Sequence, residues 1–387
     1  MMRTEHELAQ VVSLFKSDYT AAHSPTYRTL KVLHHIESCR TSALGGHVDV
    51  CDECGIVHIS YNSCRERHCP KCQGMDREAW VEARKEDILP VKYFHVVFTL
   101  PEALHQIALL HRKEAYDALF RASWGTISAF SGNLDIAPAM IAILHTWGSA
   151  LTYHPHLHCI VPGGGIGASG KWKRHPHAAS RRTVYLFPVM AMCKVFRAKY
   201  MAHLSRTLEI PPAVRKALFA KNWVVYCKPP VCGTDKVVEY LGRYVNRIAI
   251  SNRRIKSVDA DGVSFEYKNY RNDGAVEVMH LSGVEFLRRY CMHILPPGYV
   301  RIRHYGYLST ASKDRLQSIQ RQLNRPLSPR RRPKKTVAQI CADKGLDYNL
   351  CPQCGAGHLH FVKAISYWPR APGGSYAALR ELLSAAI

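Results

Sequence analysis

The chain has 387 residues and a formal net charge of +23, which comes from 53 basic and 30 acidic side chains. This length allows two or three domains. The sequence contains no run of about eighteen apolar residues, so no membrane span is predicted. The first eight residues lack the apolar core of a signal peptide, so we expect a cytoplasmic protein. The charge favours a polyanionic partner, chiefly nucleic acid, and 20 tyrosines offer rings on which unpaired bases stack.

Two helices are predicted before the first cysteine knuckle. Residues 5–17 repeat apolar side chains at helical spacing. A second helix is expected to about Ser38, with Ser24 as its N-cap and Pro25 at its first position. These helices and the cysteines that follow predict a helical zinc-binding domain over residues 1–90.

Four cysteines form two CxxC knuckles, Cys51 with Cys54 and Cys69 with Cys72. Cysteines of a cytoplasmic protein stay reduced, and two knuckles supply the four thiolates of a tetrahedral zinc site. We therefore expect one structural zinc ion held by these four residues. A second zinc ion, or hydrogen bonds within a loop, are the two interpretations of the neighbouring Cys39, His47, Cys64 and His68.

A second domain is expected over residues 91–320. A helix over about 76–88 stops before Pro90, and residues 93–100 form an aromatic and β-branched run that is typical of a buried strand. A long helical region then follows from Pro101 to about residue 130.

The stretch 153–165 contains a histidine pair, His156 and His158. On a strand, both rings would point to one face, about 7 Å apart along the chain, where they can converge on one divalent ion. The chain has 22 histidines, so this spacing also arises without a function. The three glycines at 163–165 predict a flexible turn after the strand.

A helix beginning at Thr234 carries two tyrosines, Tyr240 and Tyr244, which lie four residues apart and therefore on one face. Packing of both rings in the core is the alternative to a chemical role. A hairpin is predicted next, with strands over 248–258 and 263–270.

Basic side chains accompany these motifs. Residues 301–307 mix basic and aromatic side chains, a composition suited to a phosphate backbone with stacked bases. The candidates for DNA contact are Arg65, Arg67, Arg243, Arg247, Arg301 and Arg303.

The last part of the chain, residues 321–387, is expected to be a basic linker followed by a CxxC segment. Residues 321–335 contain seven basic side chains, three prolines and no acidic side chain. Cys351 and Cys354 make half of a zinc site. The other half is open: a distant knuckle, or the nearby Cys341, His358 and His360.

These parts together suit metal-assisted transesterification of DNA. The ion would polarise the scissile phosphate, and a tyrosine hydroxyl would attack it to leave a 5′-phosphotyrosine bond. The covalent bond conserves the phosphodiester energy, so no nucleotide cofactor is required. A second tyrosine allows a second strand transfer.

Several motifs in matching order over roughly residues 25–320 resemble the two-tyrosine, rolling-circle HUH transposases of the IS91 type. The motifs are Cys64-Arg-Glu-Arg-His-Cys-Pro-Lys-Cys72, Val97-Phe-Thr-Leu-Pro101, His145-Thr-Trp-Gly148, His154-Pro-His-Leu-His158, Pro162-Gly-Gly-Gly165, Tyr240-Leu-Gly-Arg-Tyr244 and Arg301-Ile-Arg-His-Tyr-Gly306.

The resemblance implies an α+β fold: a small helical zinc-knuckle domain, then an HUH-type antiparallel sheet flanked by helices. It makes His156 and His158 ligands of a catalytic Mg²⁺ or Mn²⁺ ion, with manganese the better match to histidine, and Tyr240 and Tyr244 the nucleophiles. The implied substrate is single-stranded DNA at element ends, with oligomers an open question. The family often has a histidine where this chain has Asn246, so the third ligand is open among Asn246, His145 and His154.

Three other functions are alternatives to the hypothesis of a two-tyrosine transposase. A replication initiator or relaxase would use the same chemistry, and a zinc-based DNA-binding regulator would use none. A transposase with a carboxylate triad is the weaker rival, because no acidic constellation stands out.

Overall fold

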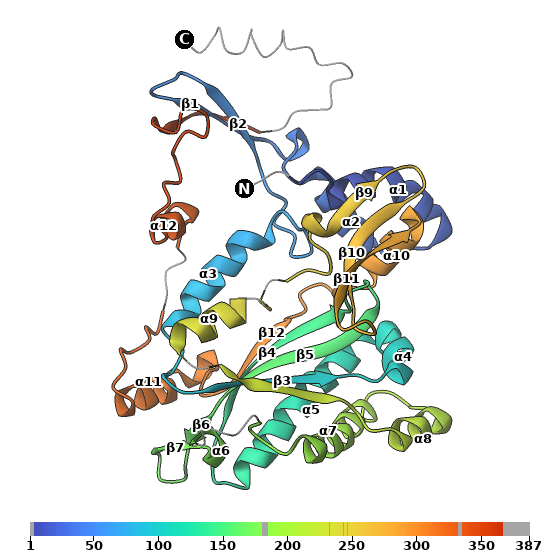
Figure 1. Cartoon of the computed structure of the whole chain (residues 1–387), viewed down its shortest axis with the longest axis vertical. Coiled ribbons are helices and arrows are strands. Elements are labelled where there is room, and N and C mark those ends of the chain that lie inside the picture. Colours follow the sequence, from blue (N-terminus) through green and yellow to red (C-terminus); the bar gives the residue numbers. More distant parts are fainter. Residues whose placement is uncertain are drawn as a thin grey trace.

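The computed structural model describes residues 4–179, 185–231, 233–242, 244–245, 247–331 and 335–366 (Figure 1). Its helices are α1 (Leu8–Ala22), α2 (Tyr27–Ser38), α3 (Gln73–Lys85), α4 (His105–Leu110), α5 (Arg112–Gly132), α6 (Pro176–Ala179), α7 (Val189–Leu204), α8 (Pro212–Ala220), α9 (Thr234–Gly242), α10 (Gly283–Cys291), α11 (Lys313–Gln322) and α12 (Val337–Ala342). Its strands are β1 (Gly46–Cys51), β2 (Val57–Tyr61), β3 (Tyr93–Thr99), β4 (Ala139–Trp147), β5 (Tyr153–Pro162), β6 (Gly164–Ile166), β7 (Trp172–Arg174), β8 (Val225–Val231), β9 (Ile255–Val258), β10 (Val263–Asn269), β11 (Ala275–Leu281), β12 (Ile302–Gly306) and β13 (Leu359–Ile365).

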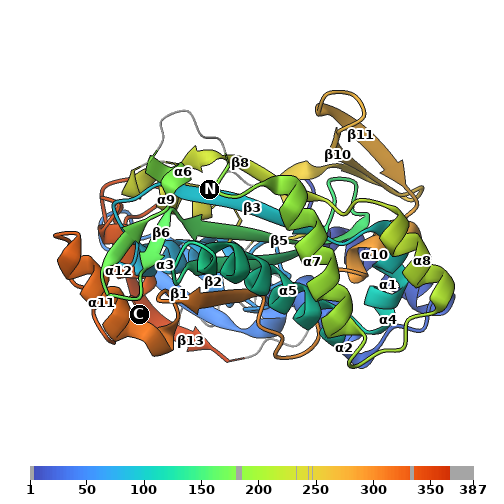
Figure 2. The ribbon, with the colours of Figure 1, turned by 90° about the horizontal axis from the view of Figure 1, so that it is seen from below.

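A five-stranded antiparallel sheet lies at the centre, with strand order β12-β4-β5-β3-β8. Successive side chains of a strand point to opposite faces, so each strand contributes to two cores. On one face Leu157 and Cys159 of β5 pack with helices α5 and α7, which cross the sheet in Figure 2. On the other face Ile160 packs with Val237 and Leu241 of α9 and with residues of α11. The predicted α+β class, with an antiparallel sheet flanked by helices, is confirmed.

A separate core joins the amino-terminal helices to a distant part of the chain. Val11 of α1 and Leu33 of α2 pack with Phe265 of β10 and Phe286 of α10. The predicted hairpin is the three-stranded sheet β11-β10-β9, and its first strand begins only at Ile255. The domain boundaries inferred from the sequence stay predictions, but this packing crosses the one near residue 90.

A third sheet has the order β13-β1-β2 and therefore combines both ends of the chain (Figure 1). Strand β13 pairs antiparallel with β1, with Cys51 opposite Leu359. The segment expected as a carboxy-terminal tail is thus hydrogen-bonded to the amino-terminal module.

The structure changes several local predictions. Helix α2 is capped by Thr26, whose side chain accepts from the Thr29 N–H, rather than by Ser24. The predicted turn at 163–165 contains strand β6 instead, and a Cβ at Gly165 would lie 2.0 Å from the Ala137 carbonyl oxygen, so only glycine permits this close approach. Within the described part of the chain, no helix has the length and apolar character that crossing a membrane requires.

Candidate functional site

Three histidines converge on one face of the central sheet. His156 and His158 point to the same side of β5, and His145 of β4 lies directly opposite His156 in the strand register. One ring nitrogen from each of the three lies within 4.8 Å of the others. The Nε2 atoms of His156 and His158 are 3.2 Å apart, a spacing that one ion at about 2.1 Å from each nitrogen bridges.

The second nitrogen of each ring is held by a hydrogen bond. Nδ1 of His156 donates to the His154 carbonyl at 2.7 Å, and Nε2 of His145 donates to the Tyr244 carbonyl at 2.9 Å. Nδ1 of His158 lies 2.9 Å from Nε2 of His95. Metal-binding histidines characteristically use their other nitrogen in this way, because the bond fixes the tautomer and the ring orientation. The three remaining lone pairs therefore suit a divalent ion.

Burial keeps these rings neutral. Desolvation lowers the pKa of His156 to about 4 and puts the pKa values of His145 and His158 well below the usual range. A neutral imidazole has a lone pair to offer, whereas a protonated ring has none. Trp147 stacks on His145, with ring centroids 4.6 Å apart, and helps to hold it in place.

Both predicted tyrosines approach the histidine cluster. Tyr240 lies on α9, but the helix ends at Gly242, so Tyr244 occupies the turn that follows rather than the same helix. The two hydroxyl oxygens are nevertheless 3.3 Å apart, and the Tyr244 ring lies 4.2 Å from the His158 ring. The site therefore combines two phenols and three imidazoles from β4, β5 and the end of α9.

His95 is the functional candidate that motif reasoning missed. It lies on β3, is 1% exposed, and its Nδ1 is 2.6 Å from the Tyr240 hydroxyl while its Nε2 faces His158. Desolvation lowers the pKa of His95 to about 3. Its signal in the sequence was a single histidine within an otherwise apolar strand.

The candidates for the third ligand separate clearly. His145 is in the cluster, whereas His154 contributes its backbone carbonyl and has its ring 6.1 Å from the His105 ring. Asn246 lies outside the described residues.

The prediction that Cys51, Cys54, Cys69 and Cys72 form one site is wrong, because the structure separates the two knuckles. Cys69 and Cys72 gather with Cys39 and Cys64, two residues that the sequence left as alternatives, while the other knuckle gathers with Cys351 and Cys354. In the first cluster, the Cys72 sulfur lies 3.6 Å from those of Cys39 and Cys64. A zinc ion with Zn–S bonds of about 2.3 Å separates its sulfurs by about 3.8 Å, so this cluster suits zinc.

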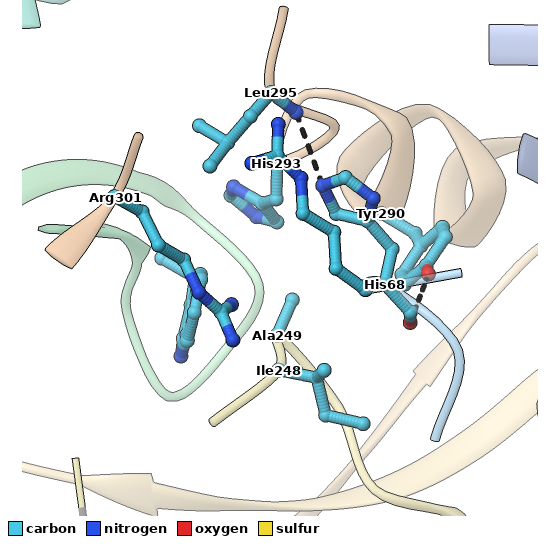
Figure 3. Close-up of a pocket in the computed structure, with 9 residues that line it drawn as sticks. His68, Ile248, Ala249, Tyr290, His293, Leu295 and Arg301 are labelled. Atoms are coloured by element: carbon cyan, nitrogen blue, oxygen red, sulfur yellow. Dashed lines mark hydrogen bonds between the residues drawn. The ribbon is translucent and has the colours of Figure 1, made fainter. Parts of the chain in front are cut away.

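The first cysteine cluster is braced against the rest of the protein, and His68 is a brace rather than a ligand. Its Nδ1 donates to Glu66 at 2.8 Å, and its Nε2 accepts from the Leu295 N–H at 3.1 Å. Tyr290 donates its hydroxyl to the His68 carbonyl at 2.8 Å. Figure 3 shows the bonds of His68 with Leu295 and Tyr290 beside a small pocket, which Arg301 also lines.

Five of the six arginines predicted to contact DNA are described, and they fall into two groups. Three are used inside the protein: Arg67 donates to the carbonyls of Pro296 and Tyr299, Arg301 to that of Arg247, and Arg303 pairs with Asp117 and lies over Phe120. Arg65 and Arg247 are exposed, so DNA contact stays a prediction for them. Arg243 lies outside the described residues.

Comparison with known proteins defines the class. A family model described as "Transposase zinc-binding domain" matches residues 11–100, and one described as "Putative transposase" matches residues 139–315. The chain is 37% identical over 385 residues to the "Putative transposase y4qJ" of Sinorhizobium fredii, covering 93% of this chain and 95% of that one. It is 26% identical over 348 residues to the transposase for insertion sequence element IS801 of Pseudomonas savastanoi pv. phaseolicola, and the match covers 85% of this chain and 82% of that one. No solved structure matches.

The chain belongs to the IS91-type transposases with an amino-terminal zinc-binding domain. The cysteine cluster of Cys39, Cys64, Cys69 and Cys72 lies within the matched zinc-binding region, which supports structural zinc.

Proposed function

We propose that this transposase nicks and rejoins single-stranded DNA at element ends through a 5′-phosphotyrosine intermediate, as in rolling-circle transposition. One observation carries the proposal: the hydroxyls of Tyr240 and Tyr244 lie 3.3 Å apart beside a cluster of three neutral histidines. Core packing of two tyrosines does not require either feature.

The lone pairs of His145, His156 and His158 would hold the catalytic ion. When bound, a divalent ion supplies positive charge to the non-bridging oxygens of the scissile phosphate. Three imidazole nitrogens favour Mn²⁺ over Mg²⁺, because magnesium prefers oxygen ligands.

Tyr240 is our candidate for the first nucleophile. With Nε2 of His158 reserved for the ion, its Nδ1 carries the proton and donates to Nε2 of His95. His95 then holds its own proton on Nδ1 and donates to the Tyr240 oxygen, 2.6 Å away. Tyr244 also points its hydroxyl hydrogen at that oxygen. Both bonds stabilise the negative charge that develops as the phenol loses its proton.

The transfer balances without a further reactant. The Tyr240 oxygen forms a bond to phosphorus and gives up its proton, and the bond from phosphorus to the 3′ oxygen breaks. The leaving oxygen takes up one proton to become a 3′-hydroxyl, so the proton lost by the phenol and the proton gained by the leaving group cancel. A free 3′-hydroxyl can later reverse the reaction on the same or another phosphotyrosine. Tyr244 supplies the nucleophile for a second strand, so two strands can be held at once.

The test is a covalent adduct on a denaturing gel. The full chain is incubated with Mn²⁺ and labelled single-stranded DNA from element ends, and we expect a labelled protein band. The double variant Tyr240→Phe/Tyr244→Phe should lose the band, whereas Tyr270→Phe, which removes the hydroxyl of a tyrosine that is 79% exposed, should keep it. Persistence of the adduct in the double variant overturns the nucleophile assignment.

The same assay separates the competing functions. A zinc-based regulator would bind the DNA but form no adduct with any metal. A replication initiator or relaxase would form the adduct with DNA from a replication or transfer origin and not with element ends.

A further inference from the structure

The second cysteine cluster joins residues from opposite ends of the chain. Cys51 lies 3.8 Å from Cys354, and Cys54 lies 3.8 Å from Cys351, measured between sulfurs. This spacing equals the edge of a tetrahedron with Zn–S bonds of about 2.3 Å, and it is far beyond the length of about 2.05 Å for a disulfide bond. All four thiols are free.

The two knuckles of this cluster are built alike. Each is followed by a glycine with a left-handed backbone, Gly55 and Gly355, both at φ 67°. Gly55 donates its N–H to the Cys51 carbonyl at 3.1 Å, and Gly355 donates to the Cys351 carbonyl at 2.9 Å. This shared turn presents both sulfurs of a knuckle to one side, as zinc knuckles do.

Each knuckle is also closed by a backbone hydrogen bond across its turn, with one more residue in the second turn than in the first. Cys51 donates its N–H across its turn to the Ile56 carbonyl at 3.1 Å, and Cys351 donates to the Gly357 carbonyl at 2.8 Å. A Cβ at Gly357 would lie 2.6 Å from the Cys51 sulfur, so a side chain there would push the two knuckles apart.

Backbone and side-chain bonds fasten the two halves together around the cysteines. Strand β13 pairs with β1 from Gly46 opposite Ile365 to Cys51 opposite Leu359. The Asp52 carboxylate accepts from the His358 N–H at 2.7 Å and contacts the His360 ring at 3.0 Å.

We propose that residues 46–61 and 350–365 form one zinc ribbon assembled from both ends of the chain, and that its ion clasps the carboxy-terminal segment onto the amino-terminal module. Closure of a chain of this length by a metal restricts the unfolded ensemble strongly in the loop-closure description. The proposal stands apart from the nuclease chemistry, because in the described part of the chain β1 and β2 lie well away from β3, β4, β5 and α9, which carry the candidate active site (Figure 1).

The basic segment 321–335 is held at both ends, by α11 before it and by α12 and the zinc ribbon after it. At one end, Leu316 and Ile319 of α11 are buried in the core that contains α9. At the other end, α12 packs on α3, where Lys344 pairs with Glu78, and the zinc ribbon follows. Loss of the ion would therefore release the segment from α12 to β13 without opening the central sheet.

Zinc content of the purified full chain tests the proposal. We expect two zinc ions per chain by elemental analysis, and one in the variants Cys351→Ser/Cys354→Ser and Cys51→Ser/Cys54→Ser. Cys341→Ser is the matched control, because this cysteine lies in the same segment but outside the cluster, and it should retain both ions. Two ions in the Cys351→Ser/Cys354→Ser variant would overturn the proposal.

Hydrogen exchange supplies a second measurement that uses the unaltered protein. Stepwise removal of zinc by a chelator should expose the amides of β13 and β1 together, while β4 and β5 stay protected. Cobalt should replace both ions and give the absorption of tetrahedral thiolate sites with an intensity for two per chain. Full protection of β13 after the loss of both ions would show that no metal clasp exists.

Discussion

His95 gives the sharpest test of the proposed active site, because its two ring nitrogens contact different partners. Nδ1 faces the Tyr240 hydroxyl at 2.6 Å, and Nε2 faces His158 at 2.9 Å. The amide nitrogen of asparagine can take the place of Nδ1, and that of glutamine the place of Nε2. His95→Asn should therefore retain the bond to Tyr240, whereas His95→Gln should retain only the bond to His158.

The size of the effect follows from the bond that is lost. A hydrogen bond to a group that becomes charged contributes about 1.5–3 kcal/mol. Removal of the bond to the Tyr240 oxygen should slow adduct formation roughly 10- to 150-fold. His95→Gln and His95→Leu should both show this loss, and His95→Asn should lie nearer to the wild type.

The assay is the single-turnover rate of adduct formation on labelled single-stranded DNA, measured over a range of Mn²⁺ concentrations. Saturating metal distinguishes two causes of a slow rate. Excess Mn²⁺ restores the rate if the variant only binds the ion more weakly, but it does not restore the rate if the tyrosine is less reactive. Zinc content and thermal unfolding confirm that each variant is folded. Equal rates for His95→Asn and His95→Gln at saturating metal would refute the proposed role of Nδ1.

Three further predictions concern the same region. Tyr240→Phe should abolish the first adduct, while Tyr244→Phe should keep it and lose only the second strand transfer. Mass spectrometry of the wild-type adduct identifies the tyrosine that reacts first. If that tyrosine is Tyr244, the proposed order is reversed. His145→Ala should raise the Mn²⁺ concentration for half-maximal adduct formation about tenfold or more. His154→Ala should leave that concentration unchanged, because His154 offers its backbone carbonyl rather than its ring. Equal effects of the two substitutions would remove His145 from the ligand set. Burial lowers the pKa of His156 to about 4 and that of His293 to about 3, so between these values and about 6.5 the unfolded chain binds more protons than the folded one. The free energy of unfolding should therefore be highest above about pH 6.5 and should fall towards about pH 4. Urea unfolding over that pH range measures this change. A urea midpoint that does not change with pH would contradict the burial of these rings.

The two cysteine clusters attach the zinc-binding module to different parts of the chain. The cluster of Cys39, Cys64, Cys69 and Cys72 is braced through His68 and Arg67 against α10 and the segment 295–299 that follows it. The proposed zinc ribbon instead links the module to the carboxy-terminal segment. Loss of the first ion should therefore disturb the core shared with α10, and loss of the second should free the segment from α12 to β13.

The sequence alone was sufficient for the parts of this protein that depend on local spacing. Alternation along a strand places His156 and His158 on one face, whatever the neighbouring strands are. The four-residue spacing brought Tyr240 and Tyr244 near each other even though the helix ends between them, because the Tyr244 N–H still donates to the Leu241 carbonyl at 3.0 Å. The family, the α+β class and the presence of cysteine knuckles also follow from motifs within short stretches.

Tertiary structure decided every feature that depends on which distant segments meet. Two CxxC knuckles 14 residues apart looked like one zinc site, but spacing does not state which knuckles face each other, and β13 adds to β1 across a sequence separation of about 300 residues. His145 and His95 join the site only through the registers of β4 and β3 with β5. Long-range pairing of this kind is set by the burial of both sheet faces and by hydrogen bonding of the strand edges, which no short stretch of sequence contains.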